Sequence, residues 1–318
     1  MMTTRAKIPC EAPPMKILLV PSCGLGNQLF QYAAGLFHAK QYGAHIEIVR
    51  RREEPVVSFG HPRPFLLSQF RISAPVREFN LQDRLICSVS RKKRPLVATA
   101  RFMFRAATVQ EPYEDHWTFL PTLPHKKAAH RLYVRGYFQA YQYAQDVEQR
   151  LRTEFQLRNP ATGKNLDTLE QIRAAENPVS LHVRRGDYAL FRGGAMVLAP
   201  RYYARAMQAL LQRARNPTFF VFSDDMAFAR ENLPRDKDTV FVDHNDEANP
   251  HEDLRLMSAC RHHIIANSTL SWWGAWLNPA PEKTVCAPMS WQNDDPDTPY
   301  PHILPPGWLR IDPDMPSN

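Results

Sequence analysis

The segment that decides the fold reads Pro-Val-Ser-Leu-His-Val-Arg-Arg-Gly-Asp-Tyr over residues 178–188. Its first half is a short apolar run of the kind that forms a buried parallel strand, and this run leads directly into Arg184 and Arg185. Ligands of open α/β sheets bind beyond the carboxyl ends of parallel strands. Because arginine holds phosphate groups through paired, charge-assisted hydrogen bonds, the segment predicts a diphosphate site. Taken in isolation, a surface ion-pair cluster explains it equally well.

A second segment, residues 15–35, has the pattern of a strand, a glycine turn and a helix. Gly24 and Gly26 allow a ligand to come close to the backbone, and a helix that starts at about Asn27 presents unpaired N–H groups. The pattern is not a dinucleotide fingerprint, because the third glycine of that motif would stand at Leu29. The turn therefore predicts a ligand contact and argues against NAD.

The third segment covers residues 262–277, where a short apolar strand ends in Asn267-Ser268-Thr269 and an aromatic helix follows. These three residue types favour a helix start, and the first turn of that helix is another candidate anion site. The alternative is helix capping without a ligand. The tryptophans of the helix are expected in the core.

Strands and helices alternate after residue 178, which predicts a parallel, doubly wound α/β sheet. The expected strands are 179–184, 218–222, 239–242, 263–266 and 284–287, and the expected helices are 200–215, 226–232, 251–260 and 269–277. The amino-terminal half begins in the same way, with elements expected at 15–20, 27–42, 45–49 and 132–138.

This pattern divides the chain into a Rossmann-like domain over residues 1–160 and a second one over residues 175–288. A tail over residues 289–318 is expected to pack back on the first domain. Glycine and polar residues at about 157–177 indicate the linker between the two domains.

The composition is that of an ordinary globular protein, with 318 residues, 44% hydrophobic residues and 23% charged residues. Its five cysteines are scattered without C-x-x-C spacing, which argues against a disulfide framework and a structural zinc site. No segment reads as a signal peptide or a membrane span, so we expect a cytoplasmic protein.

Basic residues outnumber acidic ones by 40 to 32, and they are dense at Arg91-Lys92-Lys93-Arg94. Such a run is typical of a solvated face, but it also suits an anionic sugar nucleotide or an anionic membrane surface. Peripheral contact with the inner membrane face therefore stays open. No helix-turn-helix, zinc-finger or RNA-recognition signature is present, so nucleic acid is not expected as a partner.

Metal sites are also not expected. Asp224-Asp225 and Asp294-Asp295-Pro-Asp297 could hold Mg²⁺ or Mn²⁺ against a diphosphate, but the two arginines already offer that charge. His262-His263 beside Cys260 lacks the spacing of metal ligands. The sequence therefore predicts no metal and no cofactor.

The motifs together resemble glycosyltransferase family 11, the α-1,2-fucosyltransferases, in its bacterial branch. The residues that carry the resemblance are Gly24-Leu-Gly-Asn-Gln-Leu-Phe-Gln-Tyr-Ala-Ala-Gly35, His182-Val-Arg-Arg-Gly-Asp-Tyr188, Phe222-Ser-Asp-Asp-Met226 and Asn267-Ser-Thr-Leu-Ser-Trp-Trp-Gly-Ala-Trp276. The resemblance implies two Rossmann-like domains facing a cleft, the GT-B architecture, with the donor held mainly by the second domain and the acceptor by the first. It implies inverting transfer of L-fucose from GDP-β-L-fucose to the 2-hydroxyl of a galactoside, in surface-glycan or O-antigen synthesis.

The resemblance also implies roles for individual residues. Arg184 and Arg185 would hold the leaving diphosphate with the hydroxyls of Ser268 and Thr269, and His182 with Asp224 or Asp225 would lie near guanine. Asn27 and Gln28 would reach acceptor or fucose across the cleft. The expected substrate-binding residues are therefore Gly24, Gly26, Asn27, Gln28, His182, Arg184, Arg185, Asp224, Asp225, Asn267, Ser268 and Thr269.

An inverting transfer requires loss of a proton from the acceptor hydroxyl, and Asp187 is the first candidate for the general base. It could instead orient one of the arginines, in which case Glu252, Asp253, Asp115 or no base at all would serve. The alternatives to fucosyl transfer are another nucleotide sugar, another fucosyl linkage, and a non-enzymatic basic binding module. The sequence does not distinguish among galactoside acceptors.

Overall fold

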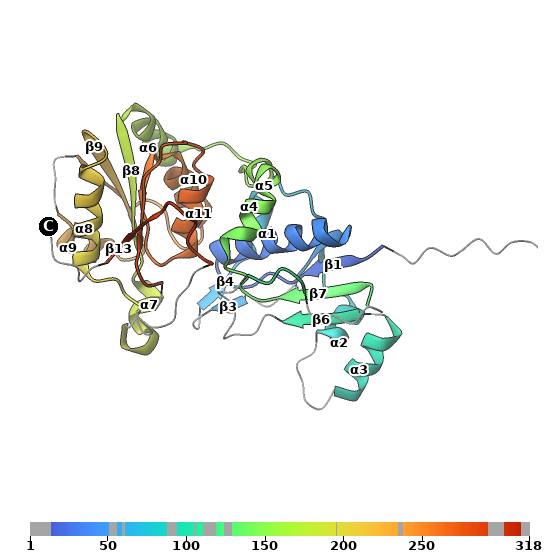
Figure 1. Cartoon of the computed structure of the whole chain (residues 1–318). Helices are drawn as coiled ribbons and strands as arrows, with labels where there is room; N and C mark the ends of the chain where they lie inside the picture. The colour runs from blue at the N-terminus through green and yellow to red at the C-terminus, as the bar shows by residue number, and fades with distance from the viewer. Residues whose placement is uncertain are drawn as a thin grey trace, which may run out of the picture.

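The computed structural model describes residues 14–50, 56–58, 61–87, 94–104, 106–110, 119–123, 129–194, 196–234, 238–291 and 302–312. The helices and strands of this part of the chain form two lobes side by side (Figure 1), and each lobe is built on one parallel sheet.

The first lobe is made of short strands and helices from the amino-terminal half. Its strands are β1 (Lys16–Leu19), β2 (His45–Arg50), β5 (Val76–Glu78), β6 (Ala106–Gln110) and β7 (Arg131–Arg135), and its helices are α1 (Leu25–Tyr42), α2 (Leu81–Ile86), α3 (Arg94–Met103), α4 (Tyr141–Asp146) and α5 (Glu148–Glu154). The strand order is β5-β2-β1-β7-β6. Ile17 and Leu19 face α1, whereas Leu18 between them faces α2 and α3, so both faces of the sheet are covered.

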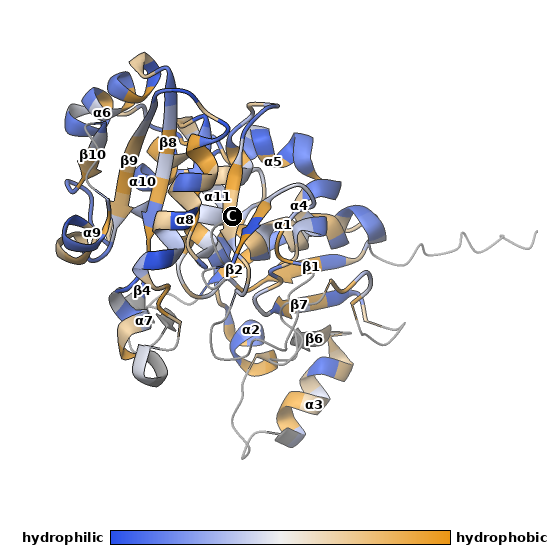
Figure 2. Ribbon diagram, turned by 60° about the vertical axis from the view of Figure 1, so that its left-hand side comes forward, coloured by the Kyte–Doolittle hydropathy of each residue, from blue (hydrophilic) through white to orange (hydrophobic). Residues whose placement is uncertain are grey.

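The second lobe is larger and holds a six-stranded sheet. Its strands are β8 (Asn177–Val183), β9 (Pro217–Ser223), β10 (Thr239–Val242), β11 (His262–Ile264), β12 (Val285–Pro288) and β13 (Leu309–Ile311), and its helices are α6 (Gly163–Ala174), α7 (Gly186–Leu190), α8 (Pro200–Leu211), α9 (Met226–Asn232), α10 (Pro250–Ala259) and α11 (Thr269–Leu277). The strands β8 and β9 are hydrophobic along much of their length (Figure 2), because helices cover both faces. The expected parallel, doubly wound sheet is confirmed.

The order of the second sheet, β10-β9-β8-β11-β12-β13, contains a reversal of direction. From β8 the chain adds β9 and β10 on one side, and it then returns to add β11, β12 and β13 on the other. Open α/β sheets bind ligands at such a point, beyond the carboxyl ends of the two strands where the order reverses. Here the crevice is the one between the ends of β8 and β11.

The two lobes share one hydrophobic core, which runs through α1 and α11. The ring of Phe30 on α1 lies 4.5 Å from that of Trp272 and 5.0 Å from that of Trp273 on α11. The indole N–H of Trp273 donates to the carbonyl of Gly26 at 3.0 Å. This apolar seam holds the two sheets in one arrangement, and the expectation of buried tryptophans is confirmed for Trp272, Trp273 and Trp276.

A two-stranded antiparallel sheet, β3 (Val56–Ser58) and β4 (His61–Arg63), extends from the first lobe. It lies beside α7 of the second lobe in both ribbon views (Figures 1 and 2). The chain then passes through the 3-10 helix η1 (Leu67–Gln69) and returns to the first sheet.

Two features differ from the sequence expectations. Residues 157–177 are not only a linker, because α6 occupies 163–174 and buries Leu169 and Ile172 against the second sheet. Part of the tail contacts the first lobe, since the backbone N–H of Tyr141 donates to the carbonyl of His302. The tail then continues into β13, which pairs with β12 at the edge of the second sheet.

Candidate active site

A cavity of about 370 Å³ lies between the lobes, at the crevice where the order of the second sheet reverses. Both lobes contribute to its wall. The first lobe supplies Gly24, Leu25, Gly26, Asn27, Arg63, Pro64 and Leu66, and the second lobe supplies His182, Arg184, Asp187, Tyr188, Ser223, Asp224, Asn245, Asp246, Glu247, Pro250, Asp253, Ser268, Thr269 and Leu270.

Arg184 stands at the end of β8 and is held in the cavity wall by two carboxylates. Its Nη2 lies 2.6 Å from Oδ1 of Asp187, and its Nη1 lies 2.8 Å from Oδ2 of Asp224. Burial lowers the pKa of the guanidinium, but the charges of Asp224 and Asp187 outweigh this effect and raise the pKa above its ordinary value. Arg184 is therefore a fixed, fully charged donor in the cavity.

Arg185 follows Arg184 in the sequence, but its side chain does not line the cavity. Its Nη1 pairs with Oδ2 of Asp225 at 2.8 Å, and its guanidinium lies 4.2 Å from the ring centre of Phe228 on α9. Asp225 caps α9 by accepting from the N–H of Phe228. Neither Arg185 nor Asp225 lines the cavity, so the structure separates the two arginines that the sequence presented as a pair.

Asp224 has both carboxylate oxygens engaged, because Oδ1 accepts from the backbone N–H of Arg185 at 2.8 Å and Oδ2 pairs with Arg184. This carboxylate also explains Gly186. A Cβ at position 186 would lie 2.6 Å from Oδ2 of Asp224, so any other residue would displace it. The glycine thus makes room for a positioning carboxylate rather than for a ligand.

Asp187 lies between two guanidinium groups from different lobes. Its Oδ1 pairs with Arg184, and its Oδ2 lies 3.1 Å from Nη2 of Arg63 at the end of β4. The side chain is only 6% exposed. Because each oxygen already faces a cation, neither is free to approach an acceptor hydroxyl, and this geometry favours the orienting role for Asp187.

The glycine turn has two different functions. Gly24 lines the cavity with nothing within 4 Å of its missing Cβ, whereas a Cβ on Gly26 would lie 2.5 Å from the backbone of Thr269. Gly26 is therefore required by the close approach of α1 to α11. Asn27 faces the cavity, and its Oδ1 accepts from Gln139 at 2.7 Å.

Gln28 and Asn267 are buried and hold the backbone instead of lining the cavity. The amide of Gln28 donates to the carbonyls of Cys23 and Pro64, and its oxygen accepts from the N–H of Leu66. The amide of Asn267 donates to the carbonyls of Met196 and Trp291.

Ser268 and Thr269 both line the cavity at the start of α11. Ser268 is the N-cap residue, but its side chain makes no capping hydrogen bond. The first turn of this nine-residue helix therefore presents hydroxyl and N–H groups to the crevice, from the side that faces Arg184.

His182 lies near the end of β8, and its side chain is buried in the cavity wall. Burial lowers the pKa of its imidazole to about 4, an effect reinforced by the charge of Arg184 and opposed by Asp224. The ring is therefore neutral at physiological pH and can serve as a hydrogen-bonding surface but not as a cation.

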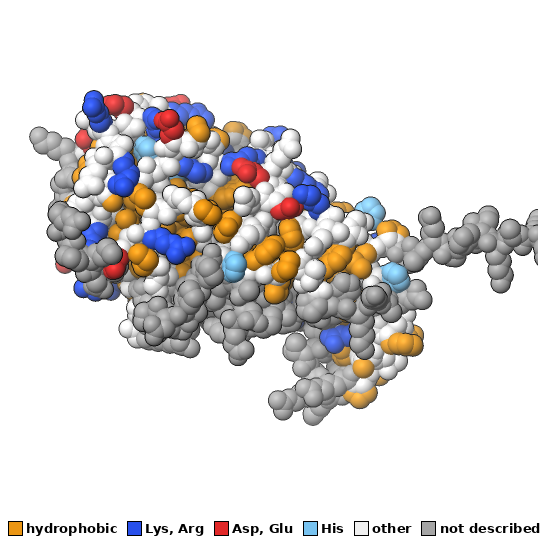
Figure 3. Space-filling model, viewed as in Figure 1, with side chains coloured by type: hydrophobic (Ala, Val, Ile, Leu, Met, Phe, Trp, Pro, Cys, Tyr) orange, Lys and Arg blue, Asp and Glu red, His pale blue; other side chains and the backbone are white. Residues whose placement is uncertain are grey.

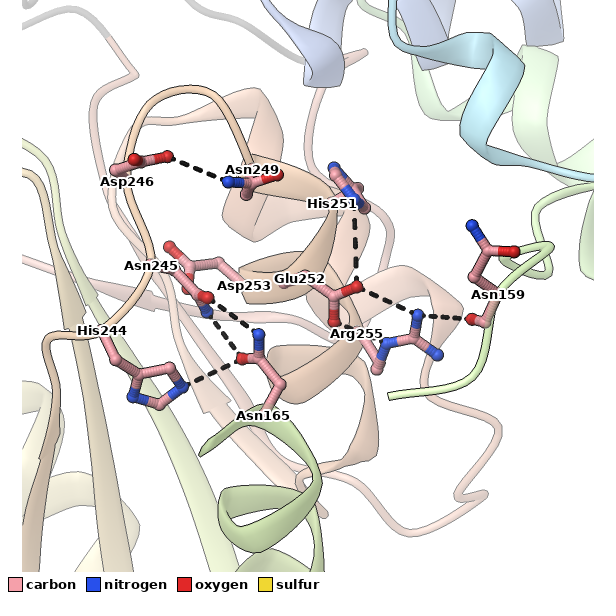
Figure 4. Close-up of polar contacts among 10 residues, drawn as sticks. All are labelled: Asn159, Asn165, His244, Asn245, Asp246, Asn249, His251, Glu252, Asp253 and Arg255. Carbon is pink, nitrogen blue, oxygen red and sulfur yellow. Dashed lines mark hydrogen bonds and ion pairs between the residues drawn. The ribbon is translucent and has the colours of Figure 1, made fainter. Parts of the chain in front are cut away.

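The loop after β10 and the start of α10 also line the cavity, and of their lining residues the sequence analysis named only Asp253, as an alternative base. Asn165, Asn245 and Asp253 form a chain of polar contacts there (Figure 4). The amide of Asn245 donates to Oδ1 of Asp253 at 2.8 Å, and Asn165 exchanges hydrogen bonds with Asn245 at 2.9 Å. The ends of β8, β9 and β10 meet at one sheet edge, and that rule could have drawn attention to this loop.

Asp253 supplies the carboxylate of this group. Burial raises its pKa to about 6, the charges of Glu252 and Asp246 act in the same direction, and the Asn245 hydrogen bond opposes them. Glu252, the other candidate base on this helix, pairs with Arg255 at 2.8 Å and does not line the cavity. Asp115 lies outside the described residues.

No cluster of three metal-ligating side chains occurs in the described part of the chain. Asp294, Asp295 and Asp297 fall outside it. His263 beside Cys260 is buried, with its two ring nitrogens on Ser180 and Asn278. None of the helices that the structure describes is long and apolar enough to span a membrane.

Comparison with known proteins gives a family match and a set of relatives. The model of glycosyl transferase family 11 matches residues 106–312. The α-1,2-colitosyltransferase of Escherichia coli is 29% identical over 91% of this chain and 96% of its own length. The O-antigen biosynthesis glycosyltransferase WbnK of Escherichia coli is 30% identical over 85% of this chain and 93% of its own length. The galactoside α-(1,2)-fucosyltransferase 1 of Leontocebus fuscicollis is 26% identical over 87% of this chain and 70% of its own length.

Among solved structures, the α-1,6-fucosyltransferase NodZ co-crystallised with GDP matches with a TM-score of 0.54 and 13% identity, over 83% of this chain and 92% of its own. A point mutant of Arabidopsis thaliana FUT1 in complex with GDP matches with a TM-score of 0.51 and 9% identity, over 88% of this chain and 71% of its own. At these identities the likeness is one of fold. It confirms the expected GT-B architecture of two Rossmann-like domains facing a cleft.

Proposed function

Because the chain belongs to glycosyltransferase family 11, we propose that it transfers L-fucose from GDP-β-L-fucose to the 2-hydroxyl of a galactoside, with inversion at the anomeric carbon. The bond from the fucose C1 to the diphosphate breaks, a bond from C1 to the acceptor oxygen forms, and GDP and a proton leave. The observation that carries the proposal is Arg184, fixed by two carboxylates at the point where the second sheet reverses.

The diphosphate is expected between the ends of β8 and β11. Arg184 faces this crevice from one side, and the start of α11 faces it from the other. Donors that are already fixed in place stabilise the charge that develops on a leaving diphosphate, which is the largest single term in many such reactions. Asp224 and Asp187 serve here as positioning residues for Arg184.

The guanine base is expected at the other end of the cavity, by the loop after β10. Guanine presents N1–H and N2–H₂ as neighbouring donors, which a carboxylate accepts as a pair. Asp224 is already engaged by Arg184 and the backbone of Arg185, and Asp225 lies outside the cavity. We therefore assign guanine to Asp253, with the neutral ring of His182 as a further contact, in place of the pair suggested by the sequence.

A second candidate donor follows from the relatives. One of them is named an α-1,2-colitosyltransferase, and colitose is L-fucose without the 3-hydroxyl. The two donors share the GDP group and differ only in the sugar, so they would use the same arginine and carboxylates. Incubation of the protein with GDP-fucose and with GDP-colitose in parallel distinguishes them.

The acceptor is proposed to be a galactoside, because relatives are named galactoside α-(1,2)-fucosyltransferases. Another relative is named for O-antigen biosynthesis, and we propose a surface glycan of that kind as the pathway. The decisive experiment is incubation with GDP-fucose and a panel of galactosides, followed by determination of the linkage formed. Thermal-shift titration with GDP, UDP and a random oligonucleotide tests the donor class and the alternative of a nucleic-acid-binding module, since a ligand of the native state raises the melting temperature.

Contact with an anionic membrane is proposed through α3. This helix extends from the first lobe and carries a hydrophobic surface (Figures 2 and 3), with Leu96 63% exposed, Phe102 86% and Met103 67%. The helix begins at Arg94, the last residue of the basic run at 91–94. Sedimentation with phosphatidylglycerol vesicles but not with phosphatidylcholine vesicles, and its loss in F102E, would support this contact; equal sedimentation with both would oppose it.

A further inference from the structure

Arg63 is the second guanidinium in the cavity wall, and it comes from the first lobe. It ends β4, lines the cavity together with Arg184, and has a side chain only 12% exposed. Arg185, which the sequence pairs with Arg184, faces Asp225 and Phe228 outside the cavity. The described cavity wall therefore contains a pair of arginines, but its members lie on opposite sides of the cleft.

Arg63 forms ion pairs with two carboxylates, those of Asp187 and Glu247. Its Nη2 lies 3.1 Å from Oδ2 of Asp187, whose other oxygen holds Arg184, and its Nη1 lies 3.2 Å from Oε2 of Glu247. Asp187 is thus a bridge that places the two guanidinium groups next to each other across the cleft. The position of one arginine depends on the position of the other.

The backbone after Arg63 is fixed from inside the first lobe. The buried side chain of Gln28 on α1 donates to the carbonyl of Pro64 and accepts from the N–H of Leu66. These two bonds clamp the segment directly after β4 to the start of α1. Arg63 therefore extends into the cleft from an ordered support, which is what an arginine needs to act without a large loss of entropy on binding.

The charge of the cavity favours a second cation beside Arg184. Its wall contains Arg63 and Arg184 against the carboxylates of Asp187, Asp224, Asp246, Glu247 and Asp253. A nucleoside diphosphate brings further negative charge into this wall. Arg184 alone, already shared between two carboxylates, would have to offset all of it.

We propose that Arg63 contacts the leaving diphosphate of the donor together with Arg184, and that Arg185 has no such contact. The inference rests on the proposed function, since it concerns the donor of that reaction. Glu247 is 61% exposed, and exposed ion pairs are weak, so its hold on Arg63 can be exchanged for a phosphate oxygen. The Asp187 bridge stays in place and keeps the guanidinium aimed at the crevice.

This arrangement would give each lobe one half of the diphosphate clamp. The donor would then contact both lobes at once. The first lobe would hold the diphosphate through Arg63 and would face the acceptor through Gly24 and Asn27.

The test compares R63A and R63K with R185A and with E247Q, each checked for folding by its thermal unfolding. E247Q removes the exposed partner of Arg63 but leaves the guanidinium, so it reports on the ion pair alone. We expect R63A to lose about a hundredfold in turnover, the scale for a charge donor that acts in the transition state, and to bind GDP about tenfold more weakly. R185A and E247Q should each lose less than R63A in both measurements.

A positional readout separates contact from support. Guanidinium ion added to R63A should restore part of the transfer rate if the missing group acted on the diphosphate, and R63K should recover only part because the paired geometry is lost. R63A with wild-type GDP affinity and turnover, or an R185A loss equal to that of R63A, would overturn the inference. Absence of transfer from GDP-fucose by the wild-type protein, with GDP binding retained and weakened in R63A, would instead overturn the proposed fucosyl transfer and leave Arg63 on the diphosphate.

Discussion

The two walls of the cavity are built in different ways. On the second-lobe side, several polar groups follow the ends of parallel strands, as Arg184 follows β8, Asp224 follows β9 and Asn245 follows β10. On the first-lobe side, the groups come from the glycine turn before α1 and from the end of the β3–β4 pair, which Gln28 ties to α1. A sheet edge aligns its residues by topology, whereas the opposite wall depends on individual tertiary contacts.

The strongest test of the second-lobe wall is the contrast between the adjacent arginines. R184A should lower turnover by at least about a hundredfold, because in the proposed reaction it removes a fixed donor to the leaving diphosphate, while R185A should lower it much less. R184K should restore only part, since the bidentate geometry is lost. Steady-state rates at saturating GDP-fucose measure the effect, and equal losses in R184A and R185A would contradict the separation seen in the structure.

Asp187 joins the two walls, and D187N asks whether it orients or accepts a proton. Asparagine keeps the size of the side chain but weakens both ion pairs with Arg184 and Arg63. If Asp187 orients the two arginines, GDP affinity and turnover should each fall by about tenfold or more in D187N. Calorimetry and rates on the same variant decide the role: normal GDP affinity with turnover reduced by about a hundredfold or more would restore the general base.

Asp253 tests the far end of the same wall through base recognition and pH. Its pKa of about 6 means that the carboxylate is ionised above that pH and becomes protonated below it. If the anion accepts from guanine as proposed, affinity for GDP-fucose should fall as the pH falls through about 6, and D253N should bind weakly without this dependence. Preference for GDP over IDP, which lacks the 2-amino group, should shrink by about tenfold in D253N. An unchanged preference would place guanine elsewhere, and E252Q is the matched control on the same helix turn.

On the first-lobe wall, G24A and G26A add the same methyl group at two positions that have different surroundings. A Cβ at position 26 would lie 2.5 Å from the backbone of Thr269, whereas position 24 is open and has an extended backbone that alanine adopts. G26A should therefore lower the free energy of unfolding by about 1–3 kcal/mol, the usual range for overpacking, and G24A should leave it nearly unchanged. Denaturant unfolding compares the two, and equal stability would mean that α1 and α11 do not meet as closely as described.

The smallest expected effect is that of metal removal. If guanidinium groups and the start of α11 offset the diphosphate charge, transfer should continue at an unchanged rate in excess EDTA. A loss of activity that Mn²⁺ or Mg²⁺ restores would assign the acidic residues of the cavity a metal-binding role.

Local pattern was sufficient for most of the second lobe, whereas in the first lobe it predicted β1, α1, β2 and β7 but none of the elements between β2 and β7. The helices expected at 226–232 and 269–277 occur with those bounds, and the strands of the second sheet follow the apolar runs, because buried parallel strands and amphipathic helices leave different periods in the chain. The helix at 163–174 was not predicted, since α6 is short of apolar residues and its start at Gly163 reads as a turn. The tail was only partly described, because the pairing of β13 with β12 joins residues that are distant in the chain.

For the site, the sequence by itself determined which strand ends deliver polar groups to the cavity. It identified Arg184, Asp187, Ser268 and Thr269, because a strand that runs into charged or capping residues delivers them to one edge of a parallel sheet. Adjacency in sequence could not tell where each side chain points. Arg184 and Arg185 leave the end of β8 in different directions, and only the positions of Asp224, Asp225 and Phe228 decide which of them enters the cavity.

Tertiary structure alone decided the rest of the wall. Arg63 lies more than a hundred residues before Asp187, in a segment without a motif, and it reaches the cavity because Gln28 holds the following backbone and α1 packs against α11. Gln28 was expected as a ligand contact, but it does not line the cavity and instead fixes the backbone after Arg63; Gly26 does line the cavity, and it also allows α1 to approach Thr269 closely. A sequence records which residues lie at the end of an element, whereas the partner that each one finds across a cleft depends on packing between elements far apart in the chain.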